Sequence, residues 1–156
     1  MTSEDFARAV IDLSPVLHRI AYTQLHQAAD REDAVQEAIR RAWEKRGHLR
    51  DERYLETWLI RILFNVCDNI RRRDGRAIPV EYVPAAVQHE SPTPLLDALR
   101  QLEDRYRLPI MLHHIEGYEV ADVAAMLRIP QGTVKSRLAR GRAKLRTLLQ
   151  EEVFEG

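Results

Sequence analysis

The sequence predicts an all-α protein of two small helical domains joined by a proline-rich linker, the C-terminal domain being a helix-turn-helix. Apolar residues recur at spacings of three and four along most of the 156 residues, and no alternating strand pattern occurs. Four of the seven prolines lie in one stretch, at Pro79, Pro84, Pro92 and Pro94. We therefore expect an N-terminal domain at residues 1–73, a linker at 74–94 and a C-terminal domain at 95–156.

The first two helices of the N-terminal domain are expected to begin at polar capping residues. Ser3 is the candidate cap of the first helix, which Ser14 and Pro15 are expected to kink or to divide into two. Asp30 is the candidate cap of the second helix, and Gly47 is expected to end it. Both helices carry one apolar stripe, so they should pack together through that stripe.

A loop and a third helix are expected to complete this domain. Residues 48–56 have no clean periodicity and indicate the loop, after which Thr57 can cap the helix. The helix is expected to end in a basic cluster, which suits the negative end of the helix dipole and could meet phosphates; the cluster comprises Arg71, Arg72, Arg73 and Arg76.

The C-terminal domain is expected to consist of helices joined by tight turns. Leu95, Leu99, Leu102 and Tyr106 mark one helix, and Pro109 should break or kink it. The pattern then predicts a turn at residues 116–117, a short helix over residues 120–127, a tight connection at 128–131 and a long helix to about residue 149.

Charge is distributed unevenly along the chain although 24 basic residues balance 24 acidic ones. A neutral total argues against a nucleic-acid-binding protein. Residues 128–149, however, hold seven basic residues and no acidic one, and the last seven residues carry a charge of −3. A local basic block of this kind is typical of a surface that binds phosphates.

The predicted final helix separates an apolar face from a basic one. At 100° per residue, one arc contains Val134, Leu138, Gly141, Leu145 and Leu148, which should pack inward. The opposite side carries small side chains and one arginine, which are Ser136, Ala139, Arg140 and Ala143. A row of basic residues flanks this side on each edge. Such a face suits a helix in a major groove. The alternative is a solvated amphipathic helix, which the absence of acidic partners at i to i+4 weakens.

No pattern for catalysis or metal binding occurs in the sequence. Cys67 is the only cysteine, so neither an internal disulfide nor a thiolate zinc site is expected. His113 and His114 are adjacent and cannot converge on one metal from a helix. We expect no catalytic residue, no metal and no cofactor, and no membrane insertion, in a cytoplasmic protein. A hydrolase within a helical bundle remains the less favoured alternative.

Three segments resemble bacterial RNA polymerase sigma factors of the extracytoplasmic-function (ECF) group. DREDAVQEAIRRAW at residues 30–43 and ETWLIRILFNVCDNIRRR at 56–73 are similar to the N-terminal domain of that family. Residues 102–146, which contain GTVKSRL at 132–138 after a short helix, are similar to the promoter-binding C-terminal domain. The resemblance implies a factor that joins core RNA polymerase, places two domains on two elements of promoter DNA and opens the DNA.

The resemblance also implies roles for particular residues. The upstream, minus-thirty-five element would be contacted by Lys135, Ser136, Arg137, Ala139 and Arg140. The downstream, minus-ten element would be held by a loop and the helix that follows it, through Leu49, Arg50, Asp51, Glu52, Arg53, Tyr54, Asn65, Arg71, Arg72 and Arg73. The alternative for Asn65 is an exposed helical side chain without a function.

Protein partners follow from the same resemblance. Asp33, Gln36 and Glu37 match the surface that family members press against the clamp helices of the largest polymerase subunit, and the flap region would meet the C-terminal domain. Family members often have an anti-sigma factor as well. A stand-alone helix-turn-helix regulator is the nearest rival, but it would leave the N-terminal domain without a task.

Overall fold

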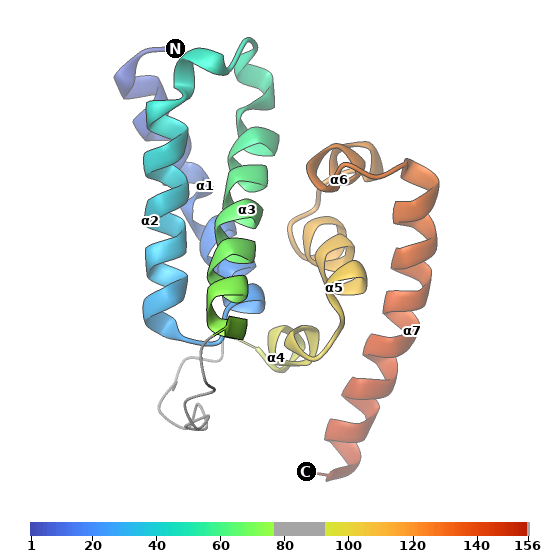
Figure 1. Cartoon of the computed structure of the whole chain (residues 1–156). Helices are drawn as coiled ribbons and strands as arrows, with labels where there is room; N and C mark the ends of the chain where they lie inside the picture. The colour runs from blue at the N-terminus through green and yellow to red at the C-terminus, as the bar shows by residue number, and fades with distance from the viewer. Residues whose placement is uncertain (77–92, 156) are drawn as a thin grey trace. The chain divides into compact units, whose positions relative to one another are not determined.

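The computed structural model describes residues 1–76 and 93–155, and every regular element in those ranges is helical. Most of the predicted linker, residues 77–92, lies outside the described residues. The chain divides into two compact units, Met1–Gln88 and His89–Gly156, each of which has its own core. The predicted all-α class, with a helix-turn-helix in the C-terminal unit, is confirmed (Figure 1).

The N-terminal unit is built from three helices, α1 (Ser3–Gln24), α2 (Ala28–Glu44) and α3 (Leu55–Arg76). Helix α2 packs against both α1 and α3. Apolar side chains from all three helices fill the core, and the fully buried ones include Leu17, Ile20, Val35, Leu59, Ile60 and Leu63. The long exposed side of α2 therefore faces away from the core and is available to a partner.

Two of the predicted N-caps in this unit are wrong by one or three residues. Thr2, and not Ser3, caps α1, because its Oγ1 accepts a hydrogen bond of 3.1 Å from the backbone N–H of Asp5. Helix α2 begins at Ala28, so Asp30 lies inside its first turn. There the carboxylate accepts a hydrogen bond of 3.3 Å from Arg73 of α3, which explains an acidic residue at this place without a capping role.

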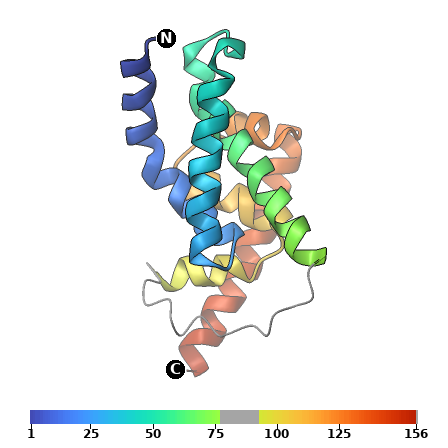
Figure 2. The same ribbon diagram turned by 60° about the vertical axis from the view of Figure 1, so that its left-hand side comes forward.

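Pro15 lies inside α1, and the helix runs past it without a break. One bent helix, rather than two short ones, is therefore the correct alternative. Figure 2 shows α1 changing direction partway along its length, as helices that contain proline do. Because a proline removes one backbone hydrogen bond, the packing of Leu13 and Leu17 into the core must compensate.

The predicted loop at residues 48–56 contains two short 3₁₀ turns, Arg46–His48 and Glu52–Tyr54. Gly47 lies within the first turn, and α2 ends before it, at Glu44. Asp51 caps the second turn by accepting a hydrogen bond of 2.9 Å from the backbone N–H of Arg53. Helix α3 consequently starts at Leu55, two residues before the predicted cap Thr57.

The C-terminal unit consists of α4 (Pro94–Arg100), α5 (Asp104–Ile110), α6 (Val120–Leu127) and α7 (Gln131–Glu155). The single helix predicted from Leu95 to Tyr106 is wrong, because residues 101–103 form a turn between α4 and α5. Buried Arg107 holds this turn: its Nη1 donates to the carbonyl of Leu102 at 2.7 Å, and its Nη2 pairs with Asp104.

Pro109 does not end the helix that contains it. The chain continues as a π-helical turn, Met111–Ile115, labelled η4. A π turn is wider than an α turn. This one begins shortly after Pro109, whose ring crowds the preceding helical turn. Gly117 then has a φ of +81°, which glycine adopts without strain, and the chain reverses into α6 as predicted.

Helices α6 and α7 form the helix-turn-helix, joined by a short connection (Figure 1). Arg128 ends α6 in the left-handed conformation, with a φ of 58°. Val134, Leu138 and Leu145 of α7 are buried, whereas Leu148 is half-buried. The predicted inward arc of the final helix is therefore confirmed, and its opposite side is exposed.

Candidate nucleic-acid interface and polymerase-binding face

The outward side of α7 carries the residues predicted to contact the upstream promoter element. Lys135, Ser136, Ala139 and Arg140 are exposed, and Arg137 is half-buried. The Ser136 hydroxyl donates to the carbonyl of Thr133 at 3.3 Å, which leaves its oxygen lone pairs available to a base or phosphate donor. The structure thus brings all five predicted side chains onto two successive turns of one helix.

The cations of α7 have almost no acidic partners. Lys144 lies 3.8 Å from Glu103 and over the ring of Tyr106. Among the described residues, no carboxylate lies within ion-pairing distance of the other five α7 cations, which are Lys135, Arg137, Arg140, Arg142 and Arg146. Arg142 instead donates to the imidazole Nε2 of His114 at 3.2 Å. A helix face that binds phosphates needs cations that are not already paired with carboxylates, whereas a face that is only solvated has no such need.

The N-terminal unit presents the predicted downstream residues in two places. The loop at residues 49–54 has Arg50, Glu52, Arg53 and Tyr54 exposed, with Leu49 and Asp51 half-buried. Asn65 is exposed on α3, ten residues after the helix begins, so it lies about 15 Å along the axis from the loop. The residues therefore define a track and not a single pocket.

An ion pair forms within the loop. Arg53 Nη2 lies 2.7 Å from Asp51 Oδ2, and its Nε also donates to the same carboxylate. This side-chain hydrogen bond, followed by the backbone N–H of Arg53, lowers the pKa of Asp51. Tyr54 projects beyond the ion pair with 60% of its surface exposed, as one of few large apolar side chains open to solvent.

The basic cluster at the end of α3 is only partly neutralised. Arg71 lies 4.0 Å from Asp68, and Arg73 lies 3.3 Å from both Asp30 and Asp74. Arg72 has no ion-pair partner among the described residues and shares a helix face with Asn65, seven residues earlier. The side chain of Arg76 lies outside the described residues.

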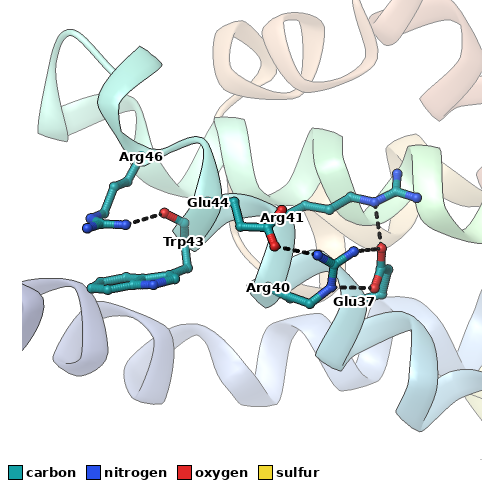
Figure 3. Close-up of polar contacts among 6 residues, drawn as sticks. All are labelled: Glu37, Arg40, Arg41, Trp43, Glu44 and Arg46. Carbon is teal, nitrogen blue, oxygen red and sulfur yellow. Dashed lines mark hydrogen bonds and ion pairs between the residues drawn. The ribbon is translucent and has the colours of Figure 1, made fainter.

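Helix α2 positions the residues predicted to bind polymerase. Asp33 and Gln36 are exposed, and Gln36 donates to Glu32 at 3.1 Å. Glu37 is 32% exposed and accepts hydrogen bonds from two arginines (Figure 3). Its carboxylate receives Nε and Nη2 of Arg40 at 3.0 and 2.6 Å, and Nε of Arg41 at 2.8 Å. These bonds, those from Arg40 first, lower the pKa of Glu37 to about 2.

The three residues predicted to bind polymerase leave out two arginines, Arg40 and Arg41, that lie on the same face of α2. They follow Glu37 at i+3 and i+4, the spacings at which helical side chains meet, so the signal was available. Arg40 continues the chain of contacts to Glu44 at 2.5 Å. The face predicted to bind polymerase is therefore a mixed ionic surface and not a simply acidic one.

No metal-binding cluster accompanies these surfaces in the described part of the chain. Within residues 1–76 and 93–155, no group of three or more His, Cys, Asp or Glu side chains is arranged to hold a metal ion. His113 and His114 stack edge to face, and His113 Nδ1 lies 2.8 Å from the carbonyl of Tyr118. In the same ranges, no helix is both long and apolar enough to cross a membrane.

Comparison with known proteins assigns both units. Residues 10–77 match the family model of Sigma-70 region 2, and residues 93–145 match that of Sigma-70 region 4. The ECF RNA polymerase sigma factor SigM of Mycobacterium tuberculosis is 37% identical over 139 residues, which cover 85% of this chain and 71% of SigM. The chain belongs to the ECF sigma factors. It is accordingly a transcription initiation factor that acts with RNA polymerase at promoters.

A further ECF sigma factor and two solved structures are similar along most of this chain. SigW of Bacillus subtilis is 29% identical, over 94% of this chain and 89% of its own. The structure of sigma factor RpoE in complex with the anti-sigma factor NepR, from Bartonella quintana, matches with a TM-score of 0.78 and 28% identity, covering 94% of this chain and 98% of RpoE. CnrH, in complex with the cytosolic domain of CnrY, matches with a TM-score of 0.76 and 25% identity, covering 96% and 90% of the two chains.

Proposed function

We propose that this ECF sigma factor reads the upstream promoter element with the outward side of α7. The observation that supports this most strongly is the row of α7 cations without a described carboxylate partner. Lys135 and Arg137 would meet phosphates, while Ser136 and Arg140 would reach base edges. Ala139 cannot hydrogen-bond through its side chain, so it would contact a thymine methyl group or allow close approach.

The N-terminal unit is proposed to recognise and open the downstream element. Arg50 and Tyr54 project from the loop, and Asn65 and Arg72 continue the exposed track along α3. An amide suits a base edge, an aromatic ring can stack on a base, and arginines suit phosphates. Extruding a base costs a few kcal/mol, which contacts of this kind would have to offset.

Core polymerase is the proposed protein partner, and the task is divided between the domains. The N-terminal domain, residues 1–73, would bind the clamp helices of the largest subunit through the α2 face of Asp33, Gln36 and Glu37. The C-terminal domain, residues 95–156, would meet the flap region. The linker, residues 74–94, would connect the two domains. Because the structural relative RpoE is in complex with an anti-sigma factor, we also propose an anti-sigma partner for this chain, in the cytoplasm. The sigma factor would bind the promoter and open the DNA, and the polymerase would carry out RNA synthesis.

A mobility-shift assay with promoter duplex DNA tests this proposal. The free protein, core polymerase and their mixture are each titrated against the same duplex and against a scrambled one. Tight binding with promoter preference is expected from the mixture alone, because the free protein is neutral overall and offers one basic helix. Equally tight promoter-specific binding by the free protein would instead indicate a stand-alone regulator.

The polymerase-binding face is tested separately by assembly. Replacing Asp33 and Glu37 together with alanine should reduce binding to core polymerase while the circular-dichroism signal of the helices is retained. Asp33 is exposed and Glu37 is half-buried at the surface of α2, and neither belongs to the apolar core. Normal assembly of the double variant would show that this face is only solvated.

A further inference from the structure

A groove of about 450 Å³ runs between α2 and α3 on the side of the predicted polymerase-binding residues. Its rim is ionic and its floor is apolar, because buried Val66 and half-buried Ile70 come from α3. The polar lining comprises Asp33, Gln36, Glu37, Arg40, Arg41, Asn69 and Arg73. An apolar floor strengthens any ionic contact made above it, since it excludes water.

Most charges of this groove are already satisfied within the protein. Both oxygens of Glu37 accept hydrogen bonds from arginines, and Arg40 divides its nitrogens between Glu37 and Glu44 (Figure 3). Arg73 donates to Asp30 and Asp74. Glu37 is therefore a poor direct acceptor for a cation from a partner, despite its place on the face.

Arg41 is different because only one of its donor nitrogens is used. Its Nε donates to Glu37 at 2.8 Å, and no described residue accepts a hydrogen bond from its two terminal nitrogens. Figure 3 shows those nitrogens pointing away from the Glu37 carboxylate. The side chain is 35% exposed, so it is partly immobilised by packing while its free end stays open. A pre-oriented guanidinium fork of this kind matches a carboxylate with two parallel hydrogen bonds.

We propose that this groove receives an acidic side chain of core polymerase, that the terminal nitrogens of Arg41 bind its carboxylate, and that Glu37 is the positioning residue of Arg41. This rests on the proposed polymerase-binding function of the face. Exposed Asp33 has no ion-pair partner among the described residues and is therefore free to accept a basic side chain of the same partner. Asp33 and Arg41 are eight residues apart, about 12 Å along α2. The docking segment should thus present a basic and an acidic side chain about 12 Å apart.

Equilibrium binding of the full chain to purified core polymerase tests the inference. Arg41→Gln should weaken binding by about tenfold or more, because a charge-assisted bidentate contact is lost. Arg41→Lys should fall between Arg41→Gln and the wild type, since it keeps the charge and loses the fork. Arg8→Gln is the matched control, because Arg8 is an exposed arginine of the same unit without an ion-pair partner among the described residues. It should stay within about twofold of the wild type.

One further variant, Asp33→Asn, separates failure of this inference from failure of the proposed function. If Asp33→Asn weakens binding while Arg41→Gln binds as the wild type does, the acidic-side-chain site is overturned and the polymerase-binding face stands. If both variants bind normally, the face itself is wrong. Thermal unfolding of each variant distinguishes a lost contact from a lost fold.

Charge exchange identifies the partner chemistry directly. Arg41→Glu should abolish binding, and an acid-to-arginine substitution on the polymerase clamp helices should restore it. Rescue at one acidic position, with no rescue of Asp33→Asn by the same polymerase variant, is the expected result. Failure of every surface acidic position on those helices to restore binding would overturn the proposal.

Discussion

Gly141 lies where the final helix approaches α5 most closely. A Cβ atom added at this position would be 2.5 Å from Cδ1 of Ile110 and 3.3 Å from Cβ of Tyr106. Both neighbours are buried, so neither can move without disturbing the core of the C-terminal unit. Periodicity places Gly141 on the inward arc, but only the packing shows why a larger residue does not fit there.

Gly141→Ala should therefore destabilise the C-terminal unit, and Gly132→Ala provides the matched control. Overpacking costs about 1–3 kcal/mol, which outweighs the gain of about 1 kcal/mol from the better helix propensity of alanine. A Cβ atom added at Gly132 would meet no atom within 4 Å, so alanine there should gain stability by up to about 1 kcal/mol. Urea unfolding measures both. A Gly141→Ala variant as stable as Gly132→Ala would contradict the packing described.

The thiol of Cys67 should be unreactive in the folded protein. It is fully buried in α3, and desolvation, with a smaller effect of Asp68, raises its pKa to about 12. The thiolate is the nucleophile, so a maleimide at neutral pH should modify Cys67 only as the N-terminal unit unfolds. Labelling followed by mass spectrometry, with and without urea, checks this. Rapid stoichiometric labelling of protein that keeps its full helical signal would disprove the burial.

His114 should make stability depend on pH. Partial burial, followed by the charges of His113 and Arg142, lowers its pKa, and neutral Nε2 accepts the hydrogen bond from Arg142. A histidine with a lowered pKa contributes stability that is present above the unfolded pKa of about 6.5 and lost as pH falls below it. Urea unfolding at about pH 7.5 and about pH 5.5 should show a smaller loss for His114→Gln than for the wild type. An equal loss for His114→Gln, with His48→Gln as the control, would contradict this.

Helices α2 and α7 show opposite uses of the same side chain. In α2, arginines at i+3 and i+4 from Glu37 are held by carboxylates of their own helix. In α7, residues 128–149 contain no acidic residue, so its arginines have no such partner. This contrast could be predicted from spacing alone, because helical neighbours at i+3 and i+4 are set by the periodicity. The pairing of Arg142 with His114, which are 28 residues apart, could not.

Arg140→Ala should weaken use of promoters that depend on the upstream element. A base contact made by arginine is worth about 1–3 kcal/mol of discrimination, so the preference among promoters should change. Arg146→Ala is the comparison, because Arg146 lies further along the same helix without a described ion-pair partner. It should weaken binding similarly on all promoters and reduce the salt slope by about one. Holoenzyme binding at several salt concentrations measures both, and unchanged promoter preference in Arg140→Ala would refute the assignment.

Helix ends were harder to predict than helix existence. Thr2 and Ser3 are adjacent and equally good caps, so composition cannot choose between them. Leu55 begins α3 before the predicted cap because Asp51 already satisfies the preceding turn. Residues 95–106 have continuous periodicity, and the break depends on Arg107 reaching the carbonyl of Leu102. Each difference arises from a hydrogen bond that periodicity does not encode.

Across the whole molecule, the 24 basic and 24 acidic residues balance in number but are distributed unevenly along the chain. Six of the seven basic residues of 128–149 lie on one helix, α7, whereas several arginines of the N-terminal unit, Arg40, Arg41 and Arg73 among them, lie in ion pairs. The upstream residues could be predicted because one helix face determines their placement. Arg41 could not be singled out in advance, since its proposed role depends on a groove formed by two helices.

A neutral total also suits a factor that binds promoters in company with polymerase. Non-specific affinity for DNA grows with the number of cations that meet phosphates, so a free protein with one basic helix should bind duplex DNA weakly. Simultaneous contacts of both units with the promoter would supply the remaining affinity for DNA, because linked binding events reinforce each other. Promoter selection is thus expected to require the polymerase, which holds both units on the DNA.

Run-off transcription by purified core polymerase tests most directly whether α7 reads the upstream element for a polymerase-bound factor. The wild-type protein and a Lys135→Ala, Arg140→Ala double variant are each added to core polymerase on promoters selected with the reconstituted holoenzyme. We expect transcripts only when core and wild-type protein are both present, and a loss of upstream-element-dependent transcripts with the double variant although it still assembles. Equal initiation by the double variant, or no initiation by a wild-type protein that binds promoter DNA alone, would contradict this function.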